Sequence, residues 1–201
     1  FKPYGLGKAK KSDRIRVDHK KADQAQVMLG WPGFAYGHRS NPIVGVMNTI
    51  LGGSMSSRLF IQVRERHGLA YTVRSGSENY RDTGYVYVRA GLDPKNINKA
   101  IKVIWQEIEK LQNKKVTKRE LEDAKTHLRG ATTLSMEDSS AQANWYGKQA
   151  ILSDKIETQT STLTSIQTLI DCLYEQIHLL KHSRFSSSTE RYVDEHPQGR
   201  L

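Results

Sequence analysis

Several features that mark particular protein classes are scarce or missing in this sequence of 201 residues. It has a single cysteine, Cys172, which excludes an internal disulfide and any metal site built from several thiolates. A reducing compartment such as the cytoplasm or the mitochondrial matrix is therefore favoured. No apolar run approaches the roughly 18 to 20 residues that cross a bilayer, and the start lacks the apolar stretch of a signal peptide, so we expect no membrane contact. The first residue is Phe1 rather than methionine, which favours a fragment or a processed product.

Acidic residues are also in the minority, with 21 Asp and Glu against 31 Lys and Arg, a net charge of +10. Eight of the basic residues fall within residues 1–21, beside two aspartates, so much of the excess lies at the N-terminal end. A basic arm of this kind is typical of a solvated linker. Nucleic-acid binding is a less favoured alternative, because no aromatic ribonucleoprotein motif or zinc-finger spacing accompanies the charge. We expect a basic arm over residues 1–12, one domain over 13–185 and a polar tail over 186–201.

Hydrophobic patterning predicts an α+β domain with a mainly antiparallel sheet, in two layers, with the helices on one face. Alternation predicts two strands joined by a polar turn near the start, and a hairpin with its turn at 79–84. Apolar residues at helical spacing and capping signals predict the helices. The expected strands are 14–19, 25–29, 70–75 and 85–90, and the expected helices are 41–51, 57–67, 97–111, 118–131, 140–152 and 166–180.

Chemistry-bearing residue types form few patterns here. His178 and His182, with Glu175, could share a metal from one helix, but the apolar stripe over 166–180 indicates that they lie on its polar face. No His-Glu-x-x-His or His-x-x-Glu-His motif is present, so a polar helix face is favoured over a zinc site. Cys172 is interpreted as an inert, half-buried thiol. The Gly52-Gly53-Ser54 run follows a predicted helix rather than a strand, which disfavours a phosphate-binding loop.

The stretch from Phe60 to Tyr71 is the most informative one. Arg64 stands in the last turn of a predicted helix, Gly68 ends that helix, and Tyr71 opens the next strand. A long cation and a phenol on either side of a tight corner can converge on one carbonyl oxygen or oxyanion and donate hydrogen bonds to it. The residues alone leave an alternative open, in which Arg64 pairs with Glu65 or the helix C-terminus and Tyr71 packs in the sheet.

Five segments, in the same order and spacing, resemble the second, substrate-binding half of the insulinase/pitrilysin family of zinc metallopeptidases, which includes the mitochondrial processing peptidase. They are Leu51-Gly-Gly-Ser-Met-Ser-Ser-Arg-Leu-Phe60, Arg64-Glu-Arg-His-Gly-Leu-Ala-Tyr71, Tyr80-Arg-Asp-Thr-Gly84, Ala90-Gly-Leu-Asp-Pro94 and Thr117-Lys-Arg-Glu-Leu-Glu-Asp-Ala-Lys125. Together they cover the chain from about Arg14 to Leu152, which makes the resemblance far more specific than any single motif.

The resemblance implies a clam-shell of paired α+β domains. One half holds zinc on a His-x-x-Glu-His helix with a more distant glutamate, and the other half contributes an arginine and a tyrosine that reach the peptide. Arg64 and Tyr71 match that pair in position and context. Because this chain lacks the inverted zinc motif, the resemblance implies a C-terminal half without metal, inactive alone, with zinc in a companion domain or subunit.

In that arrangement the companion supplies the zinc and the glutamate that takes the proton, while Arg64 and Tyr71 position the peptide and stabilise the oxyanion. A second hypothesis is a catalytically silent scaffold or substrate-presenting subunit, since relatives without zinc serve as such. A basic nucleic-acid-binding domain is the third.

Overall fold

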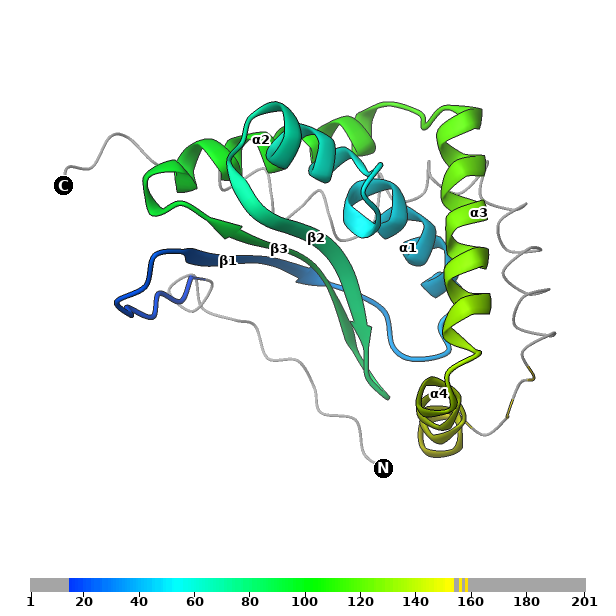
Figure 1. Ribbon diagram of the computed structural model, residues 1–201. Helices are drawn as coiled ribbons and strands as arrows, with labels where there is room; N and C mark the ends of the chain where they lie inside the picture. The colour runs from blue at the N-terminus through cyan, green and yellow to red at the C-terminus, as the bar shows by residue number, and fades with distance from the viewer. Residues whose placement is uncertain (1–14, 154–155, 157, 159–201) are drawn as a thin grey trace.

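The computed structural model describes residues 15–153, together with residues 156 and 158 (Figure 1). The predictions for the basic arm, for Cys172, for Glu175, His178 and His182, for a helix over 166–180 and for the polar tail lie outside these residues. The elements, in chain order, are β1 (Ala25–Pro32), α1 (Asn41–Asn48), η2 (Thr49–Gly53), η3 (Phe60–Arg66), β2 (Ala70–Asn79), β3 (Gly84–Leu92), η4 (Pro94–Asn96), α2 (Ile97–Asn113), α3 (Lys118–Ser135) and α4 (Ser139–Leu152).

The sheet has three antiparallel strands in the order β1-β3-β2. The hairpin of β2 and β3 turns at Tyr80–Thr83, where the sequence predicted it, and β1 pairs with the other edge of β3 from Ala25 opposite Leu92 to Pro32 opposite Tyr85. The three strands alternate between a buried face and an exposed face, as β-branched and polar residues alternate along them. The predicted α+β class with an antiparallel sheet is confirmed.

The predicted strand over 14–19 is wrong where the structure describes it. Residues 15–22 have no regular secondary structure and are exposed, and Arg16 pairs with Asp18 two residues away at 3.1 Å. A strand needs a neighbour to satisfy its backbone groups, and β1 uses the free edge of β3 instead of pairing with this segment. Residues 15–19 therefore have the alternating pattern of a strand but no partner strand among the described residues.

The predicted helix over 41–51 is present as α1 followed directly by the π-helical turn η2. Ser40 is the N-cap residue, and Pro42 stands within the first turn, where its fixed φ suits a helix. Gly52 lies inside η2 and against β2, because a Cβ there would be 2.5 Å from the backbone nitrogen of Ser75. Close packing on the sheet thus explains this glycine.

The second predicted helix, over 57–67, is present as the π-helix η3, and no serine side chain caps it. Ser57 donates its hydroxyl to the carbonyl oxygen of Ser54 at 2.5 Å, so the serines close a turn, and Leu59 is the N-cap residue without a side-chain bond. A π-helix of seven residues is rare, and such helices occur frequently at functional sites. The end of η3 is therefore a candidate location for functional side chains.

Helices α1, α2 and α3 form a layer on one side of the sheet (Figure 1). The main core lies between α2, η3 and the sheet, and its fully buried members include Leu59, Leu92 and Ile104. A second apolar cluster joins α1 and η2 to α3 through Ile50 and Leu121. None of the described helices packs on the opposite face of the sheet, which we call the open face.

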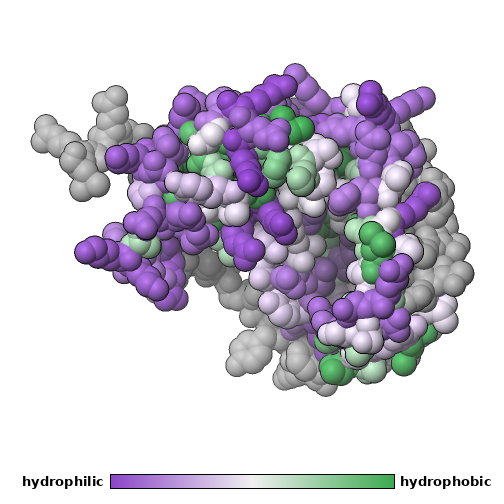
Figure 2. Space-filling model, viewed as in Figure 1, coloured by the Kyte–Doolittle hydropathy of each residue, from purple (hydrophilic) through white to green (hydrophobic). Residues whose placement is uncertain are grey.

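Helix α3 begins with the predicted capping motif, because the Thr117 hydroxyl accepts a hydrogen bond from the backbone N–H of Glu120. Helix α4, which Asp138 caps, projects beyond the sheet and leaves Ile151 73% exposed. Figure 2 shows apolar surface over this end of an otherwise largely hydrophilic face. None of the helices in residues 15–153 is long and apolar enough to cross a bilayer.

Candidate functional site

The corner between η3 and β2 is fixed to the core on both sides. Val63 is fully buried at the end of η3, and Leu69 and Ala70 are buried at the start of β2. Arg64 directly follows Val63, and Tyr71 directly follows Ala70, yet both are exposed. Each candidate side chain therefore projects from a backbone that buried apolar residues hold in place.

Gly68 makes the corner possible. Its φ of +59° lies in the left-handed region, which glycine adopts without the steric cost that a Cβ brings. Its N–H donates to the Arg64 carbonyl at 3.1 Å, and the Leu69 N–H donates to the Val63 carbonyl at 2.9 Å. The chain leaves the helix through two nested hydrogen bonds and turns at once into β2, as the sequence predicted for this glycine.

Tyr71 occupies an irregularity in the sheet that the sequence does not signal. Ala70 and Thr72 are opposite Leu92 and Gly91, two consecutive residues of β3, so Tyr71 is an extra residue, a β-bulge. Because of the bulge, Tyr71 is exposed beside Thr72 instead of pointing into the core, and its side chain is 56% exposed. Bulges commonly redirect a side chain next to an active site.

The side chains of Arg64 and Tyr71 are available to a ligand. The Arg64 guanidinium carbon lies 4.9 Å from the centroid of the Phe60 ring, one turn back on η3, which supports the side chain without using its hydrogen-bond donors. Neither Arg64 nor Tyr71 makes a side-chain hydrogen bond or ion pair with any residue in the described part of the chain. Among the described residues no ion pair joins Arg64 to Glu65, and Tyr71 is exposed rather than buried in the sheet.

A partly buried ion pair ties the segment before η3 to helix α3. Arg58 donates from Nε and Nη2 to the two carboxylate oxygens of Glu120 at 2.7 and 2.8 Å. The bond from Arg58 holds the pKa of the Glu120 carboxyl below its usual value, and the same bond raises the pKa of Arg58. Sequence reasoning missed this pair, because 62 positions separate its members and neither residue type signals the other.

A polar pocket of about 200 Å³ lies beside this ion pair. Hydroxyl-bearing residues such as Ser54 and Ser56 line one wall, and Asp123 and His127 of α3 line the other. The described hydrogen bonds do not link these hydroxyls to His127, so the pocket offers no nucleophile with an aligned base.

The donor set of the described residues does not fit a catalytic zinc ion. No group of three His, Cys, Asp or Glu residues in the described part of the chain is placed to hold a metal. A catalytic zinc site needs three protein ligands and an open position. The corner of Arg64 and Tyr71, which offers a guanidinium and a phenol for hydrogen bonding, is therefore the candidate site of the described residues.

Comparisons with known proteins bear on the family and the fold of this chain. The family model described as the peptidase M16 inactive domain matches residues 2–128. An uncharacterized zinc protease of Streptomyces coelicolor is 38% identical over 138 residues, which are 69% of this chain and 30% of the relative. An uncharacterized zinc protease of Bacillus subtilis is 32% identical over 168 residues, which are 84% of this chain and 41% of the relative.

Among solved structures, a protease from Helicobacter pylori superposes with a TM-score of 0.68 at 22% identity, over 82% of this chain and 38% of that one. This similarity shows a shared fold. The chain spans well under half the length of the two curated relatives that it matches.

Proposed function

The chain belongs to the family of the peptidase M16 inactive domain, and from this membership we propose that it is the half of a zinc protease that binds the peptide and completes the active site of a zinc-bearing companion. The observation that carries the proposal is the corner of η3 and β2, where Arg64 and Tyr71 are exposed, without side-chain hydrogen-bond or ion-pair partners in the described chain, and held by buried neighbours. Zinc, with its ability to activate water, belongs to the companion, since the described residues offer no ligand set for it.

In this proposal, Tyr71 is a neutral hydrogen-bond donor. Its phenol O–H can donate one hydrogen bond to the carbonyl oxygen that becomes negatively charged when water adds to the peptide bond. The β-bulge supports this role, because it directs the ring out of the sheet while Ala70 keeps the backbone fixed. A donor that needs no rearrangement during the reaction stabilises the transition state more effectively.

In the same proposal, Arg64 is a planar, positively charged hydrogen-bond donor. Its guanidinium can bond a peptide carbonyl or a developing oxyanion through two N–H groups at once, which fixes orientation as well as charge. The stack on Phe60 limits the freedom of this long side chain before the peptide binds. Arg64 therefore positions the peptide while Tyr71 acts on the reacting carbonyl.

The test is Tyr71→Phe in a complex of this chain with its zinc-bearing half. The ring is retained, so folding and zinc content should not change, but turnover should fall about 100-fold because one oxyanion donor is lost. Arg64→Lys retains the charge and loses the planar fork, so it should raise KM as well as lower kcat. Melting temperature, zinc content and steady-state kinetics on one peptide measure these effects.

Tyr146→Phe is the matched control, because it removes a phenol hydroxyl from α4, far from the corner, and should leave turnover unchanged. Unchanged turnover in a folded, zinc-loaded Tyr71→Phe complex would contradict the catalytic proposal. The corner would then be structural, and the scaffold or substrate-presenting hypothesis would replace it.

A further inference from the structure

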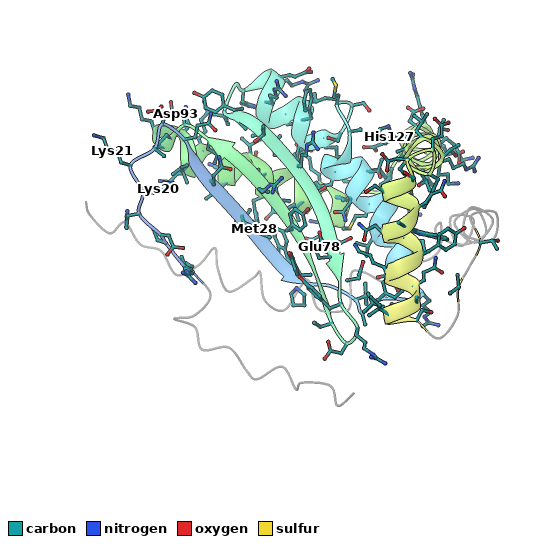
Figure 3. All side chains as sticks on the ribbon, turned by 60° about the horizontal axis from the view of Figure 1, so that its bottom comes forward. Lys20, Lys21, Met28, Glu78, Asp93 and His127 are labelled. Atoms are coloured by element: carbon teal, nitrogen blue, oxygen red, sulfur yellow. The ribbon has the colours of Figure 1, made fainter. Side chains whose placement is uncertain are left out.

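The open face of the sheet carries a regular arrangement of side chains. Figure 3 looks towards this face, from which Met28 of β1 and Glu78 of β2 project. The register aligns its residues in rows across the three strands. From the η3 corner towards the hairpin turn, the rows are Gln26, Gly91 and Thr72, then Met28, Arg89 and Arg74, then Gly30, Tyr87 and Gly76, then Pro32, Tyr85 and Glu78.

The second row contains two arginines directly opposite each other. Arg74 of β2 pairs in register with Arg89 of β3, both are exposed, and neither forms an ion pair with a residue in the described ranges. Like charges opposite each other in an antiparallel pair destabilise a sheet. Glu78 is the one acidic residue of these three strands, and it lies four residues further along β2, about 13 Å away by strand geometry.

The neighbouring rows frame the two guanidinium groups with uncharged groups. On one side, a Cβ on Gly76 would lie 2.7 Å from the Tyr87 hydroxyl, so the Tyr87 ring lies against the β2 backbone. On the other side, a Cβ on Gly91 would lie 3.0 Å from the Thr72 hydroxyl, so this hydroxyl lies close over β3. The arginine pair therefore forms a local positive site between a phenol and a hydroxyl.

The positive site is continuous with the candidate catalytic corner. Tyr71 stands at the bulge beside Thr72, and Thr72 and Arg74 are successive residues of the same face. Residues at i and i+2 of a strand are about 6.7 Å apart, which is also the repeat of same-side residues in an extended peptide. A peptide whose carbonyl group reaches Tyr71 can thus place a side chain two residues away over the arginine pair.

We propose that Arg74 and Arg89 together bind the carboxylate of an Asp or Glu side chain in an extended peptide substrate, two residues from the carbonyl group that contacts Tyr71. The inference rests on the proposed function and adds a substrate preference to it. A carboxylate can accept hydrogen bonds from both guanidinium groups and neutralises the opposed charges. A ligand that binds transiently suits the arginine pair better than a permanent interface with the companion. A permanent interface would bury two opposed cations and remove their hydrating water, which is costly.

The experiment uses the full 201-residue chain and fluorescein-labelled, extended peptides of about eight residues that differ by a single Glu or Gln. The Glu position is moved along the peptide, and dissociation constants are measured by fluorescence anisotropy. We expect at least one position at which the Glu peptide binds about tenfold more tightly than the Gln peptide, an advantage that decreases with added salt. Arg74→Met and Arg89→Met should each remove this advantage, whereas Arg129→Met, an exposed arginine on α3, should retain it.

Stability gives a second measurement in the same variants. Without peptide, Arg74→Met or Arg89→Met should raise the melting temperature by about 1 to 3 °C, because the repulsion across the strands disappears. Equal dissociation constants for every Glu and Gln pair, or an advantage that survives both substitutions, would overturn the proposal. A third outcome would also overturn the proposal. If the parent chain showed no preference for Glu, and the two substitutions weakened association with the zinc-bearing half in sedimentation, the arginine pair would bind the companion and not a peptide.

The outcome is independent of the proposed catalytic role. Tyr71→Phe should leave the preference for Glu over Gln unchanged in the binding assay, because the hydroxyl that it removes is not part of the positive site. A failure of the catalytic proposal with the preference intact would leave this chain as a peptide-presenting subunit with the same acidic specificity. Loss of the preference with normal catalysis would reject the positive site alone.

Discussion

At the scale of single residues, the conformation of Gly68 determines how Arg64 and Tyr71 are placed. We predict that Gly68→Ala lowers the free energy of unfolding by about 1 to 2 kcal/mol, because a Cβ is strained at a φ of +59° even though no neighbouring atom would contact it. Urea denaturation of the full chain measures this change. In a complex with the zinc-bearing half, the variant should also lower turnover.

Gly130→Ala is the matched control for that experiment. Gly130 lies within α3, has open space where a Cβ would lie and does not have a positive φ, so alanine should stabilise the helix by about 0.5 to 1 kcal/mol. Opposite signs for the two substitutions would establish that the left-handed conformation, and not the mere loss of glycine, matters at the corner. Equal effects would contradict the argument.

Residue patterns predicted this corner only in part. Apolar spacing followed by Gly68 indicates a helix end, and Tyr71 in a Tyr- and Val-rich segment indicates a strand start, so both elements and their junction were predictable. The bulge at Tyr71 was not, because it depends on how Ala70 and Thr72 pair with a strand that follows later in the chain. The resemblance identified the two residues, and the bulge supplies the physical reason for the exposure of Tyr71.

At the scale of elements, the Arg58–Glu120 pair joins the turn before η3 to α3. Glu120→Gln should lower the free energy of unfolding at pH 7 by about 1 to 2 kcal/mol, because a charge-assisted, bidentate bond to a partly buried arginine is lost. Thermal denaturation should show a decrease of a few degrees in a chain of this length. An Arg119→Gln control removes a largely exposed ion pair with Asp123 and should have little effect.

The same pair predicts the pH dependence of stability. Since the folded-state pKa of Glu120 is lowered, its contribution is fully present above the unfolded-state pKa of about 4.3 and is lost as the pH falls through the folded-state pKa. The difference in unfolding free energy between the parent chain and Glu120→Gln should therefore be constant from pH 7 to about pH 5.5 and shrink below about pH 4. Urea titrations at these pH values test it, and a difference that stays constant down to about pH 3 would contradict it.

Elements with strong local signals were predicted well, and those that depend on partners were not. The helix over 97–111 is α2 at Ile97–Asn113, because the helical spacing of its apolar residues is a property of the segment itself. The prediction of a strand over 14–19 was wrong, because alternation does not reveal whether a strand edge is free for pairing. The edge of β3 is occupied by β1. The Arg58–Glu120 pair was hidden for the same reason, as tertiary contact alone brings its members together.

At the scale of the whole molecule, the fold is one-sided. The described helices cover one face of the sheet, while Arg74 and Arg89 are exposed on the other face. The chain belongs to the inactive-domain family and spans 30% and 41% of two zinc-protease relatives, and in the proposed function it is one wall of a larger site. In the same proposal, a peptide lies on the open face, and Tyr71 at the corner is the residue nearest the reacting bond.

This one-sided organisation leads to a prediction about metal. The described residues contain no group of three potential ligands, and in the sequence only His178 and His182, with Glu175, approach ligand spacing. We therefore expect the isolated chain to bind zinc no more tightly than micromolar and to hydrolyse no peptide. Dialysis against a mild chelator followed by metal analysis measures the first, and a fluorogenic peptide assay measures the second. The double variant His178→Ala, His182→Ala should change neither result. Stoichiometric zinc that survives dialysis in the parent chain and disappears in the double variant would contradict this prediction. It would place a metal site on this chain and remove the need for a zinc-bearing companion.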